Sequence, residues 1–180
     1  MALCCTLRRE EVLGLSWPDV DLDQRGLCIR HALTYADGLQ HLGPPKTSAG
    51  ERRITMPPIV VESLRRHRVE QAERRLLLGE TWTDMNVVVD FENGNHWKPP
   101  SFSTAWRRFA YDAGFPEITF NILRHGAATT MLAGGVDDVV AARIMGHSDT
   151  RILRRYQDIV PQLMDDAAAR VDALLGGPTR

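Results

Sequence analysis

The sequence lacks long hydrophobic runs and has few cysteines. No apolar stretch approaches the ~18 residues that a transmembrane helix needs, and residues 1–7 lack the basic start and the apolar length of a signal peptide. We therefore expect a cytoplasmic protein with no membrane partner. The three cysteines, Cys4, Cys5 and Cys28, match neither a disulfide framework nor a metal-binding spacing. We interpret them as reduced structural thiols.

Lysine is also scarce, although the chain carries 22 basic and 23 acidic residues and a net charge of −1. This balance argues against a polycation that binds nucleic acid by bulk charge, but it allows one face to be basic. Only Lys46 and Lys98 are lysines, so nearly all the positive charge is arginine. Arginine has a rigid fork that grips phosphate through two hydrogen bonds. Genome base composition produces the same bias, so the arginine content alone is weak evidence.

The 180 residues fit one domain, and their hydrophobic pattern predicts a mostly α fold with a small antiparallel β-sheet, an α+β class. The expected helices cover residues 8–15, about twenty residues from 57, and 99–113, 122–132, 136–145, 149–156 and 161–175. The expected strands cover residues 26–34, 52–56 and 86–91. Ser101 or Ser103 is the expected cap of the helix before Gly114, and Asn121 stands where the next helix should start.

The long helix from residue 57 has an apolar face and many arginines. We expect Val60, Val61, Leu64 and Val69 to face the core. Its arginines are interpreted as a solvated face in preference to a DNA contact.

Five residues together supply the groups that phosphodiester cleavage needs: Arg8, Lys46, Arg124, His147 and Tyr156. Cleavage without a metal requires a nucleophile, cations that neutralise charge on the phosphoryl oxygens, and a proton donor for the leaving oxygen. A tyrosine hydroxyl becomes a useful nucleophile only when cations surround it.

Each of these residues also has an ordinary explanation. Arg8 can pair with a glutamate of its own helix, Lys46 is a typical solvated loop lysine, and His147 follows a helix end. Tyr156 is a reasonable core residue. Arg124 differs, because a cation near a helix start is disfavoured by the helix dipole. The ordinary explanations would have to hold for five residues that also lie in the order of one known set of motifs, given next, so we interpret the five as one site.

The segments around these residues resemble the motifs of the tyrosine recombinase family, which includes the phage integrases. Residues 6–15, Thr-Leu-Arg-Arg-Glu-Glu-Val-Leu-Gly-Leu, resemble its first arginine box, and Pro-Lys-Thr at 45–47, before Arg-Arg-Ile at 52–54, resembles its β-hairpin lysine. Leu-Arg-His at 123–125 resembles its second arginine box, and Met-Gly-His-Ser-Asp at 145–149 its Leu-Gly-His-Ser box. Tyr156 follows His147 by nine residues, a spacing that the family uses for its nucleophile. The resemblance extends from about residue 6 to 170.

The resemblance implies a tyrosine recombinase catalytic-domain fold and site-specific DNA recombination or integration, as in mobile elements. Arg8 and Arg124 would clamp the phosphate, His147 would hydrogen-bond it, Lys46 would protonate the 5′ oxygen, and Tyr156 would form a 3′-phosphotyrosine intermediate that is then religated. The partners implied are double-stranded DNA and further copies of the chain, a tetramer on DNA. The family uses no metal, nucleotide or other small-molecule cofactor.

Two departures from the family pattern leave an alternative open. Asn121 stands where the second arginine box usually has a histidine that helps to manage the tyrosine proton, and an amide cannot titrate. The first arginine box begins at residue 6, so we expect residues 1–180 to be one catalytic domain without the N-terminal core-binding domain and first helices, ending in a tail helix at 161–175. The alternative is an impaired or decayed integrase remnant that only binds DNA. A type IB topoisomerase and a helical protein with surface ion pairs are further alternatives.

Overall fold

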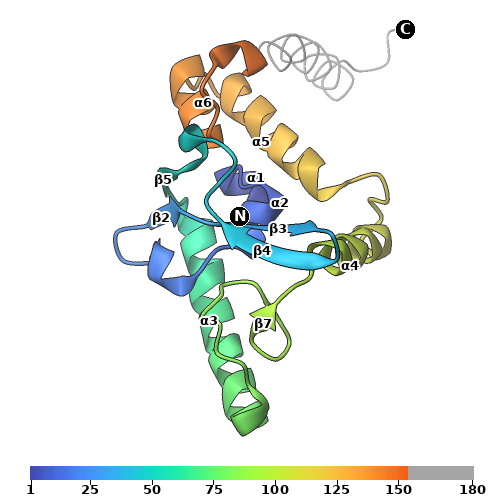
Figure 1. The fold of residues 1–180 in the computed structure, drawn as a ribbon. Helices are drawn as coiled ribbons and strands as arrows, with labels where there is room; N and C mark the ends of the chain where they lie inside the picture. Colours follow the sequence, from blue (N-terminus) through green and yellow to red (C-terminus); the bar gives the residue numbers. More distant parts are fainter. Residues whose placement is uncertain (154–180) are drawn as a thin grey trace, which may run out of the picture.

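The computed structural model describes residues 1–153 (Figure 1). Tyr156 and the tail helix expected at 161–175 lie outside the described residues. None of the helices in the described part combines the length and the apolar composition needed to cross a membrane.

The described residues confirm the α+β class. The α-helices are α1 (Ala2–Cys5), α2 (Arg9–Leu13), α3 (Pro58–Leu78), α4 (Pro99–Asp112), α5 (Phe120–Ala133) and α6 (Asp138–Met145), and short 3-10 turns follow at Trp17–Asp19, Ser48–Gly50, Gly79–Thr81 and Thr150–Leu153. The strands are β1 (Val20–Asp21), β2 (Gly26–Ile29), β3 (Ala32–Ala36), β4 (Leu39–Gly43), β5 (Arg52–Thr55), β6 (Asp90–Phe91) and β7 (Asn95–His96).

The strands form three small antiparallel sheets instead of the single sheet expected. β2 lies between β1 and β5, whereas β3 pairs with β4 and β6 pairs with β7. The strand expected over 26–34 is therefore two strands in different sheets. The break falls at Arg30 and His31, which turn toward the buried carboxylate of Asp19, with Arg30 Nη1 at 2.8 Å and His31 Nδ1 at 3.8 Å.

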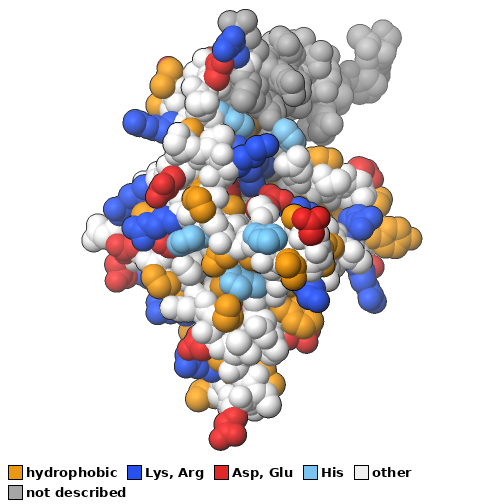
Figure 2. All heavy atoms as spheres, in the orientation of Figure 1, with side chains coloured by type: hydrophobic (Ala, Val, Ile, Leu, Met, Phe, Trp, Pro, Cys, Tyr) orange, Lys and Arg blue, Asp and Glu red, His pale blue; other side chains and the backbone are white. Residues whose placement is uncertain are grey.

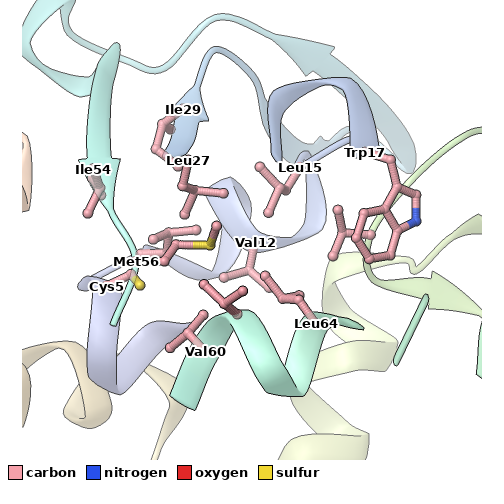
Figure 3. Packing of buried hydrophobic residues seen from close by; sticks show 13 residues of the cluster. Cys5, Val12, Leu15, Trp17, Leu27, Ile29, Ile54, Met56, Val60 and Leu64 are labelled. Carbon is pink, nitrogen blue, oxygen red and sulfur yellow. The ribbon is translucent and has the colours of Figure 1, made fainter. Parts of the chain in front are cut away.

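The main core lies between α2, the β1–β2–β5 sheet and the first turns of α3 (Figure 3). Val60, Val61 and Leu64 are buried in it, as expected from the helical spacing. Val69 is 59% exposed, so its expected place in the core was wrong. The face of α3 that continues inward carries Gln71 instead, and its side chain accepts from Trp17 Nε1 at 2.6 Å and donates to Asp90 Oδ1 at 2.6 Å. A polar network thus replaces apolar packing in the second half of this helix.

Two expected helix caps were wrong. The N-cap of α4 is Lys98, which makes no side-chain cap bond, and the Ser103 hydroxyl instead donates to the carbonyl of Pro99 at 3.1 Å. The N-cap of α5 is Thr119, whose hydroxyl accepts from the backbone N–H of Ile122. Asn121 therefore lies inside the first turn of α5 and is available for another role.

The exposure of α3 predicts different costs for the same substitution at two valines. Val61→Ala removes two buried methyl groups and should lower the free energy of unfolding by about 2 kcal/mol. Val69→Ala should change it by less than about 0.5 kcal/mol, because that side chain is exposed and alanine is the better helix former. Urea unfolding of both variants measures the difference, and equal losses would contradict the burial described for α3.

Candidate active site

A buried carboxylate, that of Glu11 on α2, lies at the centre of the candidate site. Glu11 is 2% exposed. Its Oε1 accepts from Arg8 Nη1 at 2.7 Å and from Arg52 Nη1 at 3.1 Å. Its Oε2 accepts from the backbone N–H of Arg8 at 2.9 Å and from Arg52 Nη2 at 3.0 Å. The same carboxylate therefore caps the start of α2 and fixes two guanidinium groups.

A third guanidinium, that of Arg124 on α5, lies 4.0 Å from Glu11 Oε2. Arg124 is 4% exposed, and it donates to the backbone carbonyls of Thr6 and Met145. Its Nη2 also lies 3.2 Å from His147 Nε2. These acceptors come from the segment before α2 and from the end of α6, so Arg124 joins three segments. The hydrogen bonds to them offset the unfavourable position of a cation near a helix start.

The turn after α6 carries His147 into this cluster. Gly146 is the left-handed C-cap of α6, with φ of 66°, and the backbone N–H of His147 donates to the carbonyl of Ala142 at 2.9 Å. A Cβ at Gly146 would lie 2.8 Å from Arg52 Nη1 and 3.0 Å from the carbonyl of Ala49. Only glycine fits here, because the conformation is strained for other residues and the guanidinium passes too closely.

The cluster shifts two ionisation equilibria. Burial and then the positive charges of Arg124, Arg8 and Arg52 lower the pKa of His147 from 6.5 to about 4. The imidazole is therefore neutral at pH 7. Burial alone would raise the pKa of Glu11, but its hydrogen bonds from Arg52 and Arg8 and its attraction to the Arg52 charge outweigh burial and lower that pKa below its usual value.

Three of the six site residues expected from the sequence come together here: Arg8, Arg124 and His147. Lys46 is exposed, and it lies in the loop after β4 instead of within the β3–β4 hairpin. That loop nevertheless runs into the site, since the carbonyl of Gly50 accepts from Arg52 Nη1 at 2.8 Å. Tyr156 lies outside the described residues.

Asn121 faces a groove beside the cluster. The groove has a volume of about 500 Å³ and is lined by residues of α2, α4 and the start of α5, among them Arg8, Trp106 and Asn121. Figure 2 shows that basic and histidine side chains are exposed together in the upper part of this view, where α1, α5 and α6 meet in Figure 1. No group of three or more His, Cys, Asp or Glu residues within 1–153 is arranged to hold a metal ion.

Two residues of the cluster, Glu11 and Arg52, were not among the site residues expected from the sequence. Glu11 lies in the segment that resembles the first arginine box, but the only role expected of it was to be one of two glutamates that could pair with Arg8, and the structure contains that pair. Arg52 was expected in a strand and beside the segment that resembles the β-hairpin lysine, with no role in the site, although the alternation of β5 places it on the same face as buried Ile54. An arginine on the inward face of a strand was the signal available.

Comparisons with known proteins agree on the family. Residues 1–162 match the model of the phage integrase family. An integrase of Saccharopolyspora erythraea is 30% identical over 132 residues, which cover 73% of this chain and 30% of that protein. A tyrosine recombinase XerC-like protein of Caldanaerobacter subterraneus subsp. tengcongensis is 25% identical over 181 aligned residues, covering 93% of this chain and 46% of that protein. The chain thus spans less than half the length of these relatives.

Solved structures share the fold. The Tn1549 transposon integrase in complex with transposon right end DNA superposes with a TM-score of 0.73 at 20% identity, over 93% of this chain and 56% of that one. XerA recombinase gives a TM-score of 0.68 at 20% identity, over 99% of this chain and 57% of that one. The expected tyrosine recombinase catalytic-domain fold is confirmed.

The lowered pKa of His147 predicts a loss of stability in mild acid. As the pH is lowered from 6.5 to about 4, the unfolded chain takes up a proton at this imidazole and the folded chain does not. The free energy of unfolding should therefore decrease as the pH decreases across that window. In His147→Gln the fall over the same window should be smaller. Urea unfolding at a series of pH values measures it, and equal slopes in the two proteins would contradict the shift.

Proposed function

The chain belongs to the phage integrase family, and from that membership we propose that it carries the catalytic activity of a tyrosine-type site-specific DNA recombinase. The observation that carries the proposal is the meeting of Arg8, Arg124 and His147 from three distant segments. Arg124 and Arg52 are buried cations and Arg8 lies partly exposed beside them. Such charges are costly to bury unless they serve an anion, and Glu11 alone offsets only part of them. A DNA phosphate is the anion that this cluster suits.

The proposed reaction exchanges one phosphodiester bond for another. The Tyr156 hydroxyl gives its proton to solvent water and its oxygen attacks the phosphorus, so that a bond forms between them and the bond from phosphorus to the 5′ oxygen breaks. Arg8 and Arg124 stabilise the negative charge that grows on the non-bridging oxygens. Lys46 gives its proton to the departing 5′ oxygen, and attack by a 5′ hydroxyl on the 3′-phosphotyrosine reverses these steps.

The geometry supports a distinct role for each group. Arg8 is about one-third exposed, so a phosphate can reach it from solvent, whereas Arg124 is held in place by backbone carbonyls. Such prior fixing avoids reorganisation during the reaction. Because the neutral His147 accepts at Nε2 from Arg124, its hydrogen is carried on Nδ1, which can donate to a phosphate oxygen.

The proposed partners are double-stranded DNA and further copies of this chain. Recombination between two duplexes breaks four strands, and one tyrosine serves each strand, so four protomers are required. The solved Tn1549 integrase relative is a complex with DNA, which supports the DNA partner. Light scattering of the DNA complex measures the number of protomers.

Covalent capture tests the cleavage step. With a suicide substrate, whose nicked strand loses its short 5′ product, the chain should form a protein–DNA adduct that survives denaturing electrophoresis. Tyr156→Phe should bind the same DNA and form no adduct. An adduct in Tyr156→Phe would exclude this nucleophile, and DNA binding without an adduct in the unmodified chain would favour a remnant that only binds.

Asn121 provides a second test of the site. Asn121→His places a titratable group in the groove that Arg8 also lines, and general acid–base groups contribute about 10²-fold or more to such steps. We expect the single-turnover cleavage rate to rise at least several-fold, with little change in DNA affinity. Asn121→Gln is the matched control because it keeps an amide. If Asn121→His cleaves no faster than this control, position 121 does not take part in cleavage.

A further inference from the structure

The buried arginine at the start of β5 contacts three segments of the candidate site. The Arg52 side chain is 5% exposed. Its Nη1 and Nη2 donate to the two oxygens of Glu11, at 3.1 and 3.0 Å. Nη1 also donates to the carbonyl of Gly50 at 2.8 Å, and Nε donates to the carbonyl of Ile144 at 2.7 Å. These four bonds use most of the five N–H groups that a guanidinium offers.

Each of these contacts fixes a segment that carries a reacting group. Glu11 holds Arg8 on α2. Gly50 ends the 3-10 turn that follows the Lys46 loop. Ile144 belongs to the last turn of α6, three residues before His147. The three segments are distant in sequence, and one planar group therefore sets their relative position.

We propose that Arg52 is a positioning residue for strand cleavage, whose guanidinium fork holds α2, the Lys46 loop and the end of α6 in one arrangement without contacting DNA. The inference rests on the proposed recombinase function.

The charge of Arg52 matters as well as its shape. Without it, Glu11 would keep Arg8 but lose its closest buried partner, and the next cation is Arg124, 4.0 Å away. A buried carboxylate that has lost a partner is strongly destabilised, so Glu11 draws Arg124 toward itself and away from the phosphate. Lysine restores the charge but not the geometry, because one ammonium cannot reach Glu11, Gly50 and Ile144 together.

Single-turnover cleavage of the suicide substrate tests the proposal with Arg52→Lys and Arg52→Met. Both variants should cleave about 10²-fold more slowly, since a displacement of 1 Å in a reacting group costs that much. Their dissociation constants for DNA should stay within about threefold of the unmodified chain. The dependence of affinity on salt should be unchanged, because a lost phosphate contact would lower its slope by about 0.9.

Arg74→Met is the matched control. Arg74 also pairs with a fully buried carboxylate, that of Asp90, at 2.8 Å, but on α3, and it contacts none of the site residues described above. The Arg74→Met variant should be less stable than the unmodified chain but should keep its cleavage rate when it is assayed below its unfolding temperature. The proposal is overturned if Arg52→Lys cleaves within threefold of the unmodified chain, if the salt slope falls by about one, or if Arg74→Met slows cleavage as much.

A second measurement separates this proposal from the function on which it rests. The His147 imidazole faces Arg124, Arg8, Arg52 and Glu11, and its NMR titration in the DNA-free protein is assigned by comparison with His147→Gln. In Arg52→Met the pKa of His147 should rise above about 4. If the unmodified chain forms no adduct, the proposed function fails, and this titration still decides: a pKa that stays at about 4 overturns the role of Arg52.

Discussion

The site depends on one constraint: three guanidinium groups lie within 4.0 Å of the same buried carboxylate. That carboxylate, which belongs to Glu11, accepts hydrogen bonds from Arg8 and Arg52 and lies near Arg124. Like charges in a low-dielectric interior repel strongly, and one buried carboxylate offsets only part of that repulsion. Burial and this remaining positive field together lower the pKa of His147, and the same field favours a negative charge at the cluster.

Backbone carbonyls provide the rest of the support. Arg124 is held by the carbonyls of Thr6 and Met145, and Arg52 by those of Gly50 and Ile144. Two of these carbonyls belong to the last turn of α6, where carbonyl groups lack partners within the helix and carry partial negative charge. The short α6 therefore serves the site through its C-terminal end, and the core beneath α2 holds the other half of the cluster in register.

Local patterns predicted the elements better than the contacts between them. The apolar spacing of Val60, Val61 and Leu64 and the prolines before them were enough to predict α3, because both are local signals. The burial of Gln71 in place of Val69 depends on Trp17 and Asp90, which are distant in sequence. The family motifs were recognisable because each is contiguous. The role of Arg52 could not be recognised from the sequence, because its partner Glu11 lies 41 residues earlier and only the folded chain brings the two together.

The glycine at the end of α6 has an evolutionary consequence. Position 146 is restricted first by a left-handed backbone and second by the Arg52 guanidinium beside it, and the Ala49 carbonyl adds to the backbone restriction. A lineage that lost Arg52 would relax the second restriction and keep the first, whereas a lineage that replaced Gly146 would displace the arginine at once. Inheritance at the two positions should therefore be asymmetric, with glycine outlasting arginine in descendants of this gene.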